Sequence, residues 1–314
     1  MTRLLKPPPV APGAAIGIVA PASPAQPDHF EGGLAALRDL GFTPKLAPHA
    51  RQYAPPYFAG VSEQRLADLH AAFAGADTSA VMSLRGGYGS NYLLAGLDPG
   101  AIAARPKPFF AYSDLTGLQL RLLDEIGLPA FHGPMLAADF HLPNGVHLES
   151  FRAALAGEPY TVGAAEGLRA LKPGKTHSMT RGTLYGGCLS ILVSLLGTPW
   201  EPCTEGSLLF LEDTGAKPYQ IDRMIWQLRS ARKLDGVAGI VFGEMLDCAS
   251  PGAPPELLDQ AILGALDGFE GPIAIGLRSG HVSRENVTLT FGVEAELAVD
   301  GEARLNLLEP AVAR

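Results

Sequence analysis

The stretch from Pro108 to Gly127, PFFAYSDLTGLQLRLLDEIG, changes its periodicity halfway along and decides the fold class. Its first part, Phe109–Tyr112, is a short continuous apolar run, which predicts a buried strand. From Leu115 to Ile126 the apolar residues recur at helical spacing, and a glycine follows that can end the helix. A buried strand that runs directly into an amphipathic helix is the repeating unit of an α/β fold with a mainly parallel sheet.

The same alternation extends over the N-terminal half of the chain. It predicts strands at 15–20 and 80–84 and helices at 30–40 and 62–73. Between about Tyr160 and Ser178 the periodicity fades, and Gly, Pro and Lys accumulate as they do in a linker. We therefore expect an N-terminal domain over residues 1–160, a linker over 161–178 and a C-terminal domain over 179–314.

The C-terminal half has a mixed pattern. Helices are predicted over 188–196 and 219–234, and strands over 208–211, 237–242, 272–277, 287–291, 295–299 and 303–307. Short turns join the last three strands, and one of these turns contains Asp300-Gly301, a hairpin signal. The C-terminal domain is therefore expected to be mixed α/β and to end in antiparallel strands.

The composition indicates a folded protein and excludes several kinds of partner and site. With 314 residues, 47% hydrophobic and 18% charged, the chain is long and apolar enough for two folded domains. Its formal charge of −8 repels polyphosphates, so nucleic acid is not an expected partner. The three cysteines contain no CxxC pair, which argues against a disulfide framework and a thiolate zinc site, so buried free thiols are expected. No cofactor or metal is predicted.

The sequence predicts neither a membrane-spanning helix nor a signal peptide. The most apolar stretch, Leu184–Trp200, is interrupted by Gly, Ser and Pro and falls short of the roughly 20 apolar residues that a membrane span needs. Near the N-terminus, Pro7–Pro9 follow two basic residues where a signal peptide would have an apolar helix. We therefore expect a cytoplasmic protein without a membrane partner.

Ser113 stands where the predicted strand meets the predicted helix. Such a turn projects the hydroxyl outward, and the N–H groups of the first helical turn can stabilise a nearby oxyanion. Ser113 is therefore a candidate nucleophile, although serine is also an ordinary helix N-cap residue. Ala111 and Leu115 occupy the flanking glycine positions of the GxSxG motif, which disfavours a standard α/β-hydrolase.

A serine nucleophile needs a base and a group that orients the base. Of the eight histidines, His281 is the best candidate, because it follows the predicted strand 272–277 and Gly280 permits a sharp turn before it. The run Ser207–Asp213 ends another predicted strand in two acids, Glu212 and Asp213. Strand alternation should point these two acids to opposite sides, so only one of them is expected to face the site.

A glycine-rich loop, Arg85-Gly86-Gly87-Tyr88-Gly89-Ser90, follows the strand predicted at 80–84. Its glycines allow the backbone to approach a ligand closely, either as a phosphate cradle or as half of an oxyanion hole. The loop fits neither the Walker sequence nor GxGxxG, so it is a weak nucleotide signature. Arg85 could hold a substrate carboxylate in a bidentate pair.

Taken together, these segments resemble the LD-carboxypeptidases, a family of serine peptidases that includes murein tetrapeptide carboxypeptidases and microcin-immunity peptidases. The matching segments occur in the family's order along nearly the whole chain: Ile18–Ser23, Arg85–Gly89, Tyr112–Thr116, Leu211–Asp213, and Gly280-His281 followed by Asn286. The sequence departs from the family at Ala111, where a glycine is expected before Tyr-Ser-Asp.

The resemblance assigns the nucleophile to Ser113, the orienting acid to Glu212 and the base to His281. It implies a Rossmann-like N-terminal domain and a triad assembled from both domains. The oxyanion would be held by backbone N–H groups of Asp114 and of Gly86 or Gly87, and Arg85 and Tyr88 are the candidate substrate-binding residues.

The family cleaves the bond between an L-configured centre and a C-terminal D-amino acid, typically D-alanine of a muropeptide. We therefore expect a cytoplasmic serine carboxypeptidase of cell-wall recycling that takes a muropeptide or small peptide, and the family often forms homodimers. One alternative is the microcin-immunity type, which cleaves a peptidyl-nucleotide conjugate and needs an aromatic platform for a purine. The segments that contain Trp200 and Trp226 look buried, so no such platform is expected. A further alternative is a non-catalytic α/β module that binds a phosphorylated metabolite at Gly86–Gly89.

Overall fold

The computed structural model describes residues 3–249, 252, 254 and 256–313, and the chain forms two compact units. Unit 1 contains the residues up to Glu158, the segment Arg284–Gly292 and the residues from Pro310 onward. Unit 2 contains Pro159–Ser283 and Val293–Glu309. Each unit has its own sheet and helices, which confirms the predicted α/β fold class.

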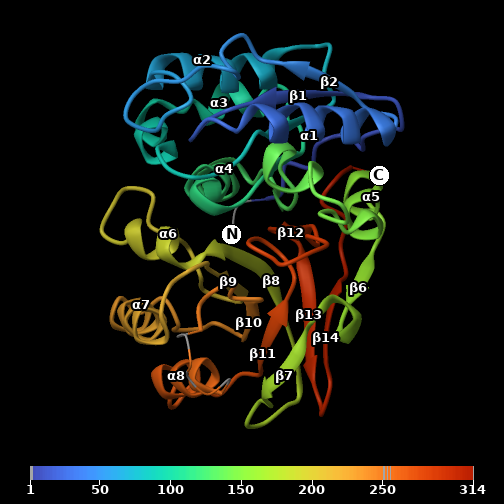
Figure 1. Cartoon of the computed structure of the whole chain (residues 1–314). Helices are drawn as coiled ribbons and strands as arrows, with labels where there is room; N and C mark the ends of the chain where they lie inside the picture. Colours follow the sequence, from blue (N-terminus) through green and yellow to red (C-terminus); the bar gives the residue numbers. More distant parts are fainter. Residues whose placement is uncertain (1–2, 250–251, 253, 255, 314) are drawn as a thin grey trace. The chain divides into compact units, whose positions relative to one another are not determined.

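Unit 1 is built on a six-stranded sheet with the order β12-β5-β4-β3-β1-β2 (Figure 1). The strands are β1 (Ala15–Val19), β2 (Thr43–Leu46), β3 (Ala80–Ser83), β4 (Phe109–Ala111), β5 (Ala130–His132) and β12 (Leu289–Phe291). Five of them run parallel, and β12 is antiparallel to β5. The helices are α1 (Pro27–Asp39), α2 (Ser62–Ala74), α3 (Pro99–Ala103), α4 (Thr116–Ile126) and α5 (Leu148–Ala156), together with the short helices η1 (Ser90–Gly96), η2 (Ser113–Leu115) and η3 (Leu136–Phe140).

The order of the parallel strands in unit 1 determines where a ligand can bind. Strands β1, β3 and β4 are buried along nearly their whole length, as expected for a parallel sheet covered on both faces. The order β2-β1-β3-β4-β5 reverses direction between β1 and β3. In such sheets the binding crevice opens at this switch point, beyond the carboxyl ends of the strands.

Unit 2 is built on an eight-stranded mixed sheet with the order β6-β14-β13-β8-β9-β10-β11-β7. Strands β8 to β11 are parallel neighbours, and the four outer strands pair antiparallel. The strands are β6 (Tyr160–Val162), β7 (Arg169–Lys172), β8 (Met179–Cys188), β9 (Ser207–Glu212), β10 (Gly239–Gly243), β11 (Ile273–Leu277), β13 (Glu294–Val299) and β14 (Ala303–Leu307). Helix α7 (Pro218–Ser230) packs against both α6 (Leu189–Ser194) and α8 (Leu257–Ala265), as Figure 1 shows.

The expected linker differs from the structure. Residues 161–178 were expected to join the domains, but β6 and β7 lie in this part of the chain and pair with β14 and β11. Both strands are short and only partly buried, so their sequence carries little apolar periodicity. Between them lies the short helix η4 (Ala164–Glu166).

The C-terminal strands also divide differently from the prediction. The hairpin through Asp300-Gly301 is confirmed, because β13 and β14 pair antiparallel. The strand predicted at 287–291 appears as β12, but it extends the sheet of unit 1 beside β5 instead of joining the C-terminal sheet. A local pattern specifies that a segment is extended, but it does not specify the sheet in which the segment pairs.

Two other expectations can be compared with the described part of the chain. Cys188 and Cys248 are buried free thiols as expected, whereas Cys203 is a free but exposed thiol. No helix within the described residues is both long and apolar enough to cross a membrane.

Candidate active site

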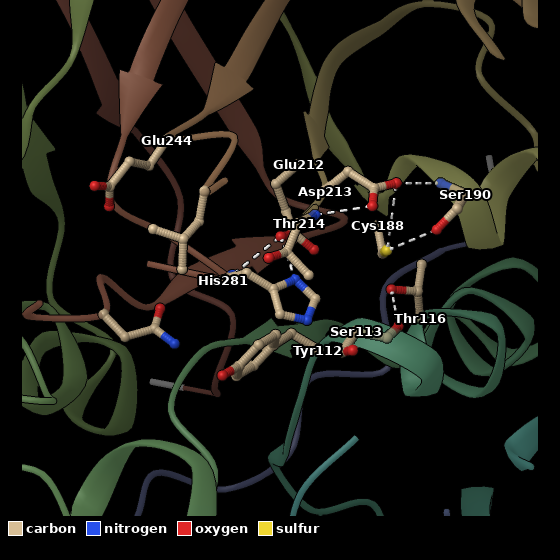
Figure 2. A network of polar contacts seen from close by, with 12 residues as sticks. Tyr112, Ser113, Thr116, Cys188, Ser190, Glu212, Asp213, Thr214, Glu244 and His281 are labelled. Carbon is tan, nitrogen blue, oxygen red and sulfur yellow. Dashed lines mark hydrogen bonds and ion pairs between the residues drawn. The ribbon is translucent and has the colours of Figure 1, made fainter. Parts of the chain in front are cut away.

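The structure places Ser113 at a strained turn in unit 1. Strand β4 ends at Ala111, and Ser113 begins η2 with a φ of 63°, a left-handed conformation that costs a non-glycine residue about 1 to 3 kcal/mol. The Ser113 carbonyl accepts a hydrogen bond of 2.8 Å from the Thr116 hydroxyl at the start of α4 (Figure 2). The predicted strand-to-helix turn is therefore confirmed, and its backbone is forced into a shape that exposes the serine.

The glycine loop packs directly on this serine. A Cβ atom at Gly86 would lie 2.7 Å from Ser113 Cβ and 2.8 Å from its Oγ, so only glycine leaves room for the hydroxyl. The same Cβ position is 3.5 Å from the backbone nitrogen of Asp114. The Gly86 backbone therefore lies beside the Ser113 hydroxyl and near the Asp114 amide.

The loop is anchored to the end of β1 through Ser23. Ser23 accepts a hydrogen bond of 3.1 Å from the Tyr88 amide at its hydroxyl, and its own amide donates to the Gly86 carbonyl at 3.3 Å. Gly87 adopts a φ of 108°, and a Cβ there would lie 2.4 Å from the Ser23 hydroxyl. Arg85 is partly exposed on the same loop. These contacts place the loop at the switch point between β1 and β3.

Asp114 connects the turn at Ser113 to the far end of the same loop. Its side chain is 4% exposed and accepts the Ser90 amide at 2.8 Å, while the Ser90 hydroxyl donates to the Asp114 carbonyl. Burial raises the pKa of Asp114, and the hydrogen bonds from Ser90 partly oppose that shift. Sequence reasoning did not identify Ser90 as a positioning residue, although it ends the quoted glycine loop.

A buried polar network holds Tyr112, the residue before Ser113. The Tyr112 hydroxyl and the Asn286 side-chain amide both donate to Asp139 Oδ1, at 3.3 Å and 3.0 Å. The amide of Met135 donates to the other oxygen of the same carboxylate at 2.8 Å. Asn286, which the family resemblance includes, therefore supports the residue before Ser113 from within unit 1.

In unit 2, Glu212 and His281 form a hydrogen-bonded pair. Glu212 ends β9 and is fully buried, and its Oε2 lies 2.7 Å from His281 Nδ1 and 3.0 Å from the His281 amide (Figure 2). A carboxylate accepts hydrogen bonds, so this contact fits the tautomer in which Nδ1 carries the proton and the opposite ring nitrogen, Nε2, has the lone pair of a base. The His281 side chain is 22% exposed, which leaves the ring accessible.

Two glycines make room for the buried carboxyl group. Gly280 has a φ of 92°, and a Cβ there would lie 2.6 Å from Glu212 Cδ. At the end of β10, a Cβ on Gly243 would lie 2.6 Å from Glu212 Cβ. The role expected for Gly280 in a sharp turn is confirmed. Gly243 was missed, although a glycine at the carboxyl end of a neighbouring parallel strand was the available signal.

The second acid of the motif faces elsewhere, as strand alternation predicts. Asp213 Oδ2 accepts the Ser190 amide at 2.8 Å and lies 3.9 Å from Cys188 Sγ, and Oδ1 accepts the Thr214 amide at 2.8 Å (Figure 2). Burial raises the pKa of Asp213 and also raises that of the Cys188 thiol. The carboxylate that His281 contacts is thus Glu212, and Asp213 secures the start of α6.

The comparisons with known proteins identify the family. Residues 16–133 match the LD-carboxypeptidase N-terminal domain, and residues 181–297 match the LD-carboxypeptidase C-terminal domain. The chain belongs to the LD-carboxypeptidase family. It is therefore a serine-type carboxypeptidase, and this membership replaces the alternative of a non-catalytic binding module.

This LD-carboxypeptidase is similar to two murein peptide carboxypeptidases and to a solved structure of the family. A probable murein peptide carboxypeptidase of Bacillus subtilis is 37% identical, with 91% of this chain and 89% of that one covered. The murein tetrapeptide carboxypeptidase of Pseudomonas aeruginosa is 34% identical, with 90% and 92% covered. Among solved structures, the microcin C7 self-immunity protein MccF in complex with glutamyl sulfamoyl guanosine matches with a TM-score of 0.88 and 25% identity, over 98% of this chain and 100% of that one.

Proposed function

We propose that this LD-carboxypeptidase releases the C-terminal D-alanine from muropeptide tetrapeptides through a triad of Ser113, His281 and Glu212. The observation that carries the proposal is the buried contact between Glu212 Oε2 and His281 Nδ1, which prepares the imidazole as a base. The strained turn at Ser113 and its glycine neighbour supply the matching nucleophile. The substrate class is supported by the two relatives named for murein peptides.

The reaction begins with attack of Ser113 Oγ on the scissile carbonyl carbon, while His281 Nε2 takes the hydroxyl proton. The negative charge moves to the carbonyl oxygen, where the amides of Asp114 and of Gly86 or Gly87 donate to it. The C–N bond then breaks, and His281 passes its proton to the amine of the departing D-alanine. An acyl-enzyme ester on Ser113 remains.

Water completes the cycle. His281 takes a proton from the water as it attacks the ester, and the second tetrahedral species expels Ser113, which regains its proton from His281. Throughout, Glu212 stabilises the imidazolium and remains ionised. Arg85 binds the terminal carboxylate of the substrate and Tyr88 contacts the adjoining peptide, which restricts cleavage to the last residue.

The test uses a purified muropeptide tetrapeptide and mass spectrometry for the loss of one alanine. The wild type should release D-alanine, and Ser113→Ala should lose about 10⁴-fold or more in kcat with an unchanged Tm. Ser194→Ala is the matched control, because Ser194 is an exposed serine on α6 whose hydroxyl bonds only to its own helix. Turnover by Ser113→Ala near the wild-type rate would refute the assignment.

A second candidate substrate is a peptidyl-nucleotide conjugate, and the structural similarity to MccF in complex with glutamyl sulfamoyl guanosine favours it. Contrary to the sequence expectation, Trp226 is 61% exposed, and Trp200 is only partly buried. The buried stripe of α7 runs through Ile221, Ile225 and Leu228, so Trp226 lies one position off that stripe and turns to solvent. Comparing D-alanine release with cleavage of glutamyl sulfamoyl guanosine, the ligand in the MccF complex, separates the two substrates.

The proposal extends to location and assembly. We place the enzyme in the cytoplasm, where muropeptides return for recycling, and propose that it forms a homodimer. Cell fractionation tests the location, and light scattering of the purified protein tests the assembly. A membrane or periplasmic fraction, or a monomer mass, would contradict the respective statement.

A further inference from the structure

A cluster of four aromatic rings lies beside the glycine loop, and only one of them, Tyr88, has a role in the reaction described above. The cluster consists of Tyr57, Phe58, Tyr88 and Tyr92, all in unit 1, and is called the tyrosine platform below. Adjacent ring centroids lie 4.7 to 6.2 Å apart. The three tyrosines are 47%, 42% and 57% exposed in chain order, so the cluster presents aromatic surface to solvent.

The buried side chain of Arg65 packs against the tyrosine platform and fixes its position. This guanidinium is 2% exposed, stacks 5.0 Å from the Phe58 ring and donates to the carbonyls of Pro21, Gly60 and Gly89. It therefore ties together the segments on either side of the rings. An aromatic surface that is fixed before a ligand arrives loses little entropy on binding.

The platform is also tied to the nucleophile turn. Gly86 packs on Ser113, and Ser90 is bonded to Asp114 at the other end of the loop, so Tyr88 lies between two anchors on that turn. Because Tyr88 follows Gly86 by two residues, their Cα atoms are at most about 7 Å apart. Tyr92 extends the platform on η1, which begins at Ser90.

The geometry of the rings indicates the chemistry of the ligand. The contacts of Tyr88 with Tyr57 and Tyr92 are edge-on, at interplanar angles of 72° and 88°. The tyrosines therefore offer separate ring faces with hydroxyls at their edges, not a parallel slot that would enclose a flat base. A pyranose ring suits such a surface, because its C–H face packs on an aromatic ring while its hydroxyls bond to phenolic oxygens.

We propose that the tyrosine platform binds the saccharide of glycan-bearing muropeptides, N-terminal to the stem peptide. This inference rests on the proposed function of the Ser113 site. In a tetrapeptide the scissile bond follows the third residue, and three extended residues span about 10 Å. With the scissile carbonyl at Ser113, the sugar of the bound substrate would lie about that far away on the platform, so the platform makes the enzyme prefer substrates that still bear glycan.

The experiment compares two substrates, the disaccharide tetrapeptide of N-acetylglucosamine and N-acetylmuramic acid, and the same tetrapeptide without sugar. For the wild type, kcat/KM should favour the glycan-bearing substrate by about tenfold, through a lower KM. In the double variant Tyr57→Ala/Tyr92→Ala the two values should converge. Tyr219→Ala, an equally exposed tyrosine on α7 of unit 2, is the matched control and should keep the wild-type ratio.

A binding measurement separates this inference from the proposed function. The peptide-free disaccharide is titrated by calorimetry into Ser113→Ala, with and without the double substitution, so that no hydrolysis is needed. Binding that is lost with the two tyrosines supports the platform. Equal binding in both proteins, no binding in Ser113→Ala, or a wild-type rate ratio of one overturns it. Hydrolysis of the free tetrapeptide tests the Ser113 site itself.

A milder variant separates the ring from its hydroxyl. Tyr92→Phe keeps the aromatic ring and removes the hydroxyl, and it should retain most of the disaccharide binding.

Discussion

The turn at Ser113 in unit 1 and the Glu212–His281 pair in unit 2 share a supporting aspartate and closely packed glycines, but the property that each contributes to the proposed reaction differs. In each, an aspartate follows the proposed catalytic residue and accepts a serine amide at 2.8 Å: Asp114 accepts Ser90, and Asp213 accepts Ser190. Both aspartates are buried, and burial raises the pKa of each. Each carboxylate thus joins the end of its strand to a neighbouring segment.

The two regions differ in the physical property on which their proposed role in the reaction depends. Ser113 depends on backbone shape, with a left-handed φ and a glycine packed on its side chain. Glu212 depends on charge, because a fully buried carboxylate contacts the imidazole that it orients. Added volume should therefore do most damage at the turn that holds Ser113, and loss of charge should do most damage at Glu212. The following changes test that contrast.

The largest effect is expected from Glu212→Gln, which keeps the volume and removes the charge. The amide cannot stabilise the imidazolium and can hold the ring in the wrong tautomer, so kcat for D-alanine release should fall by about 10⁴-fold. Glu244→Gln is the matched control, because Glu244 is in the same unit and contacts the Ser283 amide, not His281. A loss below about tenfold in Glu212→Gln would show that charge is not the deciding property.

In unit 1 the corresponding change is Gly86→Ala, which adds only volume. Its new methyl group would lie within 2.8 Å of the Ser113 hydroxyl and should lower kcat by about 100- to 1,000-fold, the loss typical when oxyanion stabilisation is disrupted. In Gly264→Ala, the control, a Cβ on helix α8 meets nothing within 4 Å and activity should be unchanged. Equal activities of the two variants would contradict the packing argument.

Gly280→Ala should affect stability in addition to rate. Alanine at a φ of 92° is strained, and its Cβ would lie 2.6 Å from the Glu212 carboxyl carbon. We expect the free energy of unfolding to fall by about 1 to 3 kcal/mol, measured by urea denaturation, together with a loss of activity. A variant with wild-type stability and activity would mean that this turn is not constrained by the buried carboxyl.

The smallest expected effect is on the pH dependence of stability, and it involves the buried aspartate of each unit. Burial raises the folded-state pKa of Asp213 above its unfolded value, so its contribution to stability is fully present in acid and is lost as the pH rises through the folded pKa. Asparagine does not ionise, so Asp213→Asn does not lose this stability as the pH rises. The Tm of the variant relative to the wild type should therefore increase from pH 4 toward pH 7, and Asp114→Asn should behave in the same way. A Tm difference that stays constant or decreases would contradict the burial argument.

The sequence predicts local features of this molecule better than distant pairings. The turn at Ser113 and the opposite directions of Glu212 and Asp213 follow from periodicity and strand alternation, which act over a few residues. Strand β12 and the two strands within the expected linker pair with partners far away in the chain, and no local pattern specifies those partners. The contacts of Arg65 and Gly243 were missed for the same reason.

The most direct test of the central claim is labelling with a serine-directed fluorophosphonate, followed by peptide mass spectrometry. If Ser113, His281 and Glu212 act as one triad, the wild type should carry a single adduct on Ser113. The adduct should be lost in His281→Ala and strongly reduced in Glu212→Gln, although these residues are 168 and 99 positions away in sequence (281 − 113 and 212 − 113). Labelling of Ser113 at an equal rate in all three proteins, or labelling at another serine, would contradict the account.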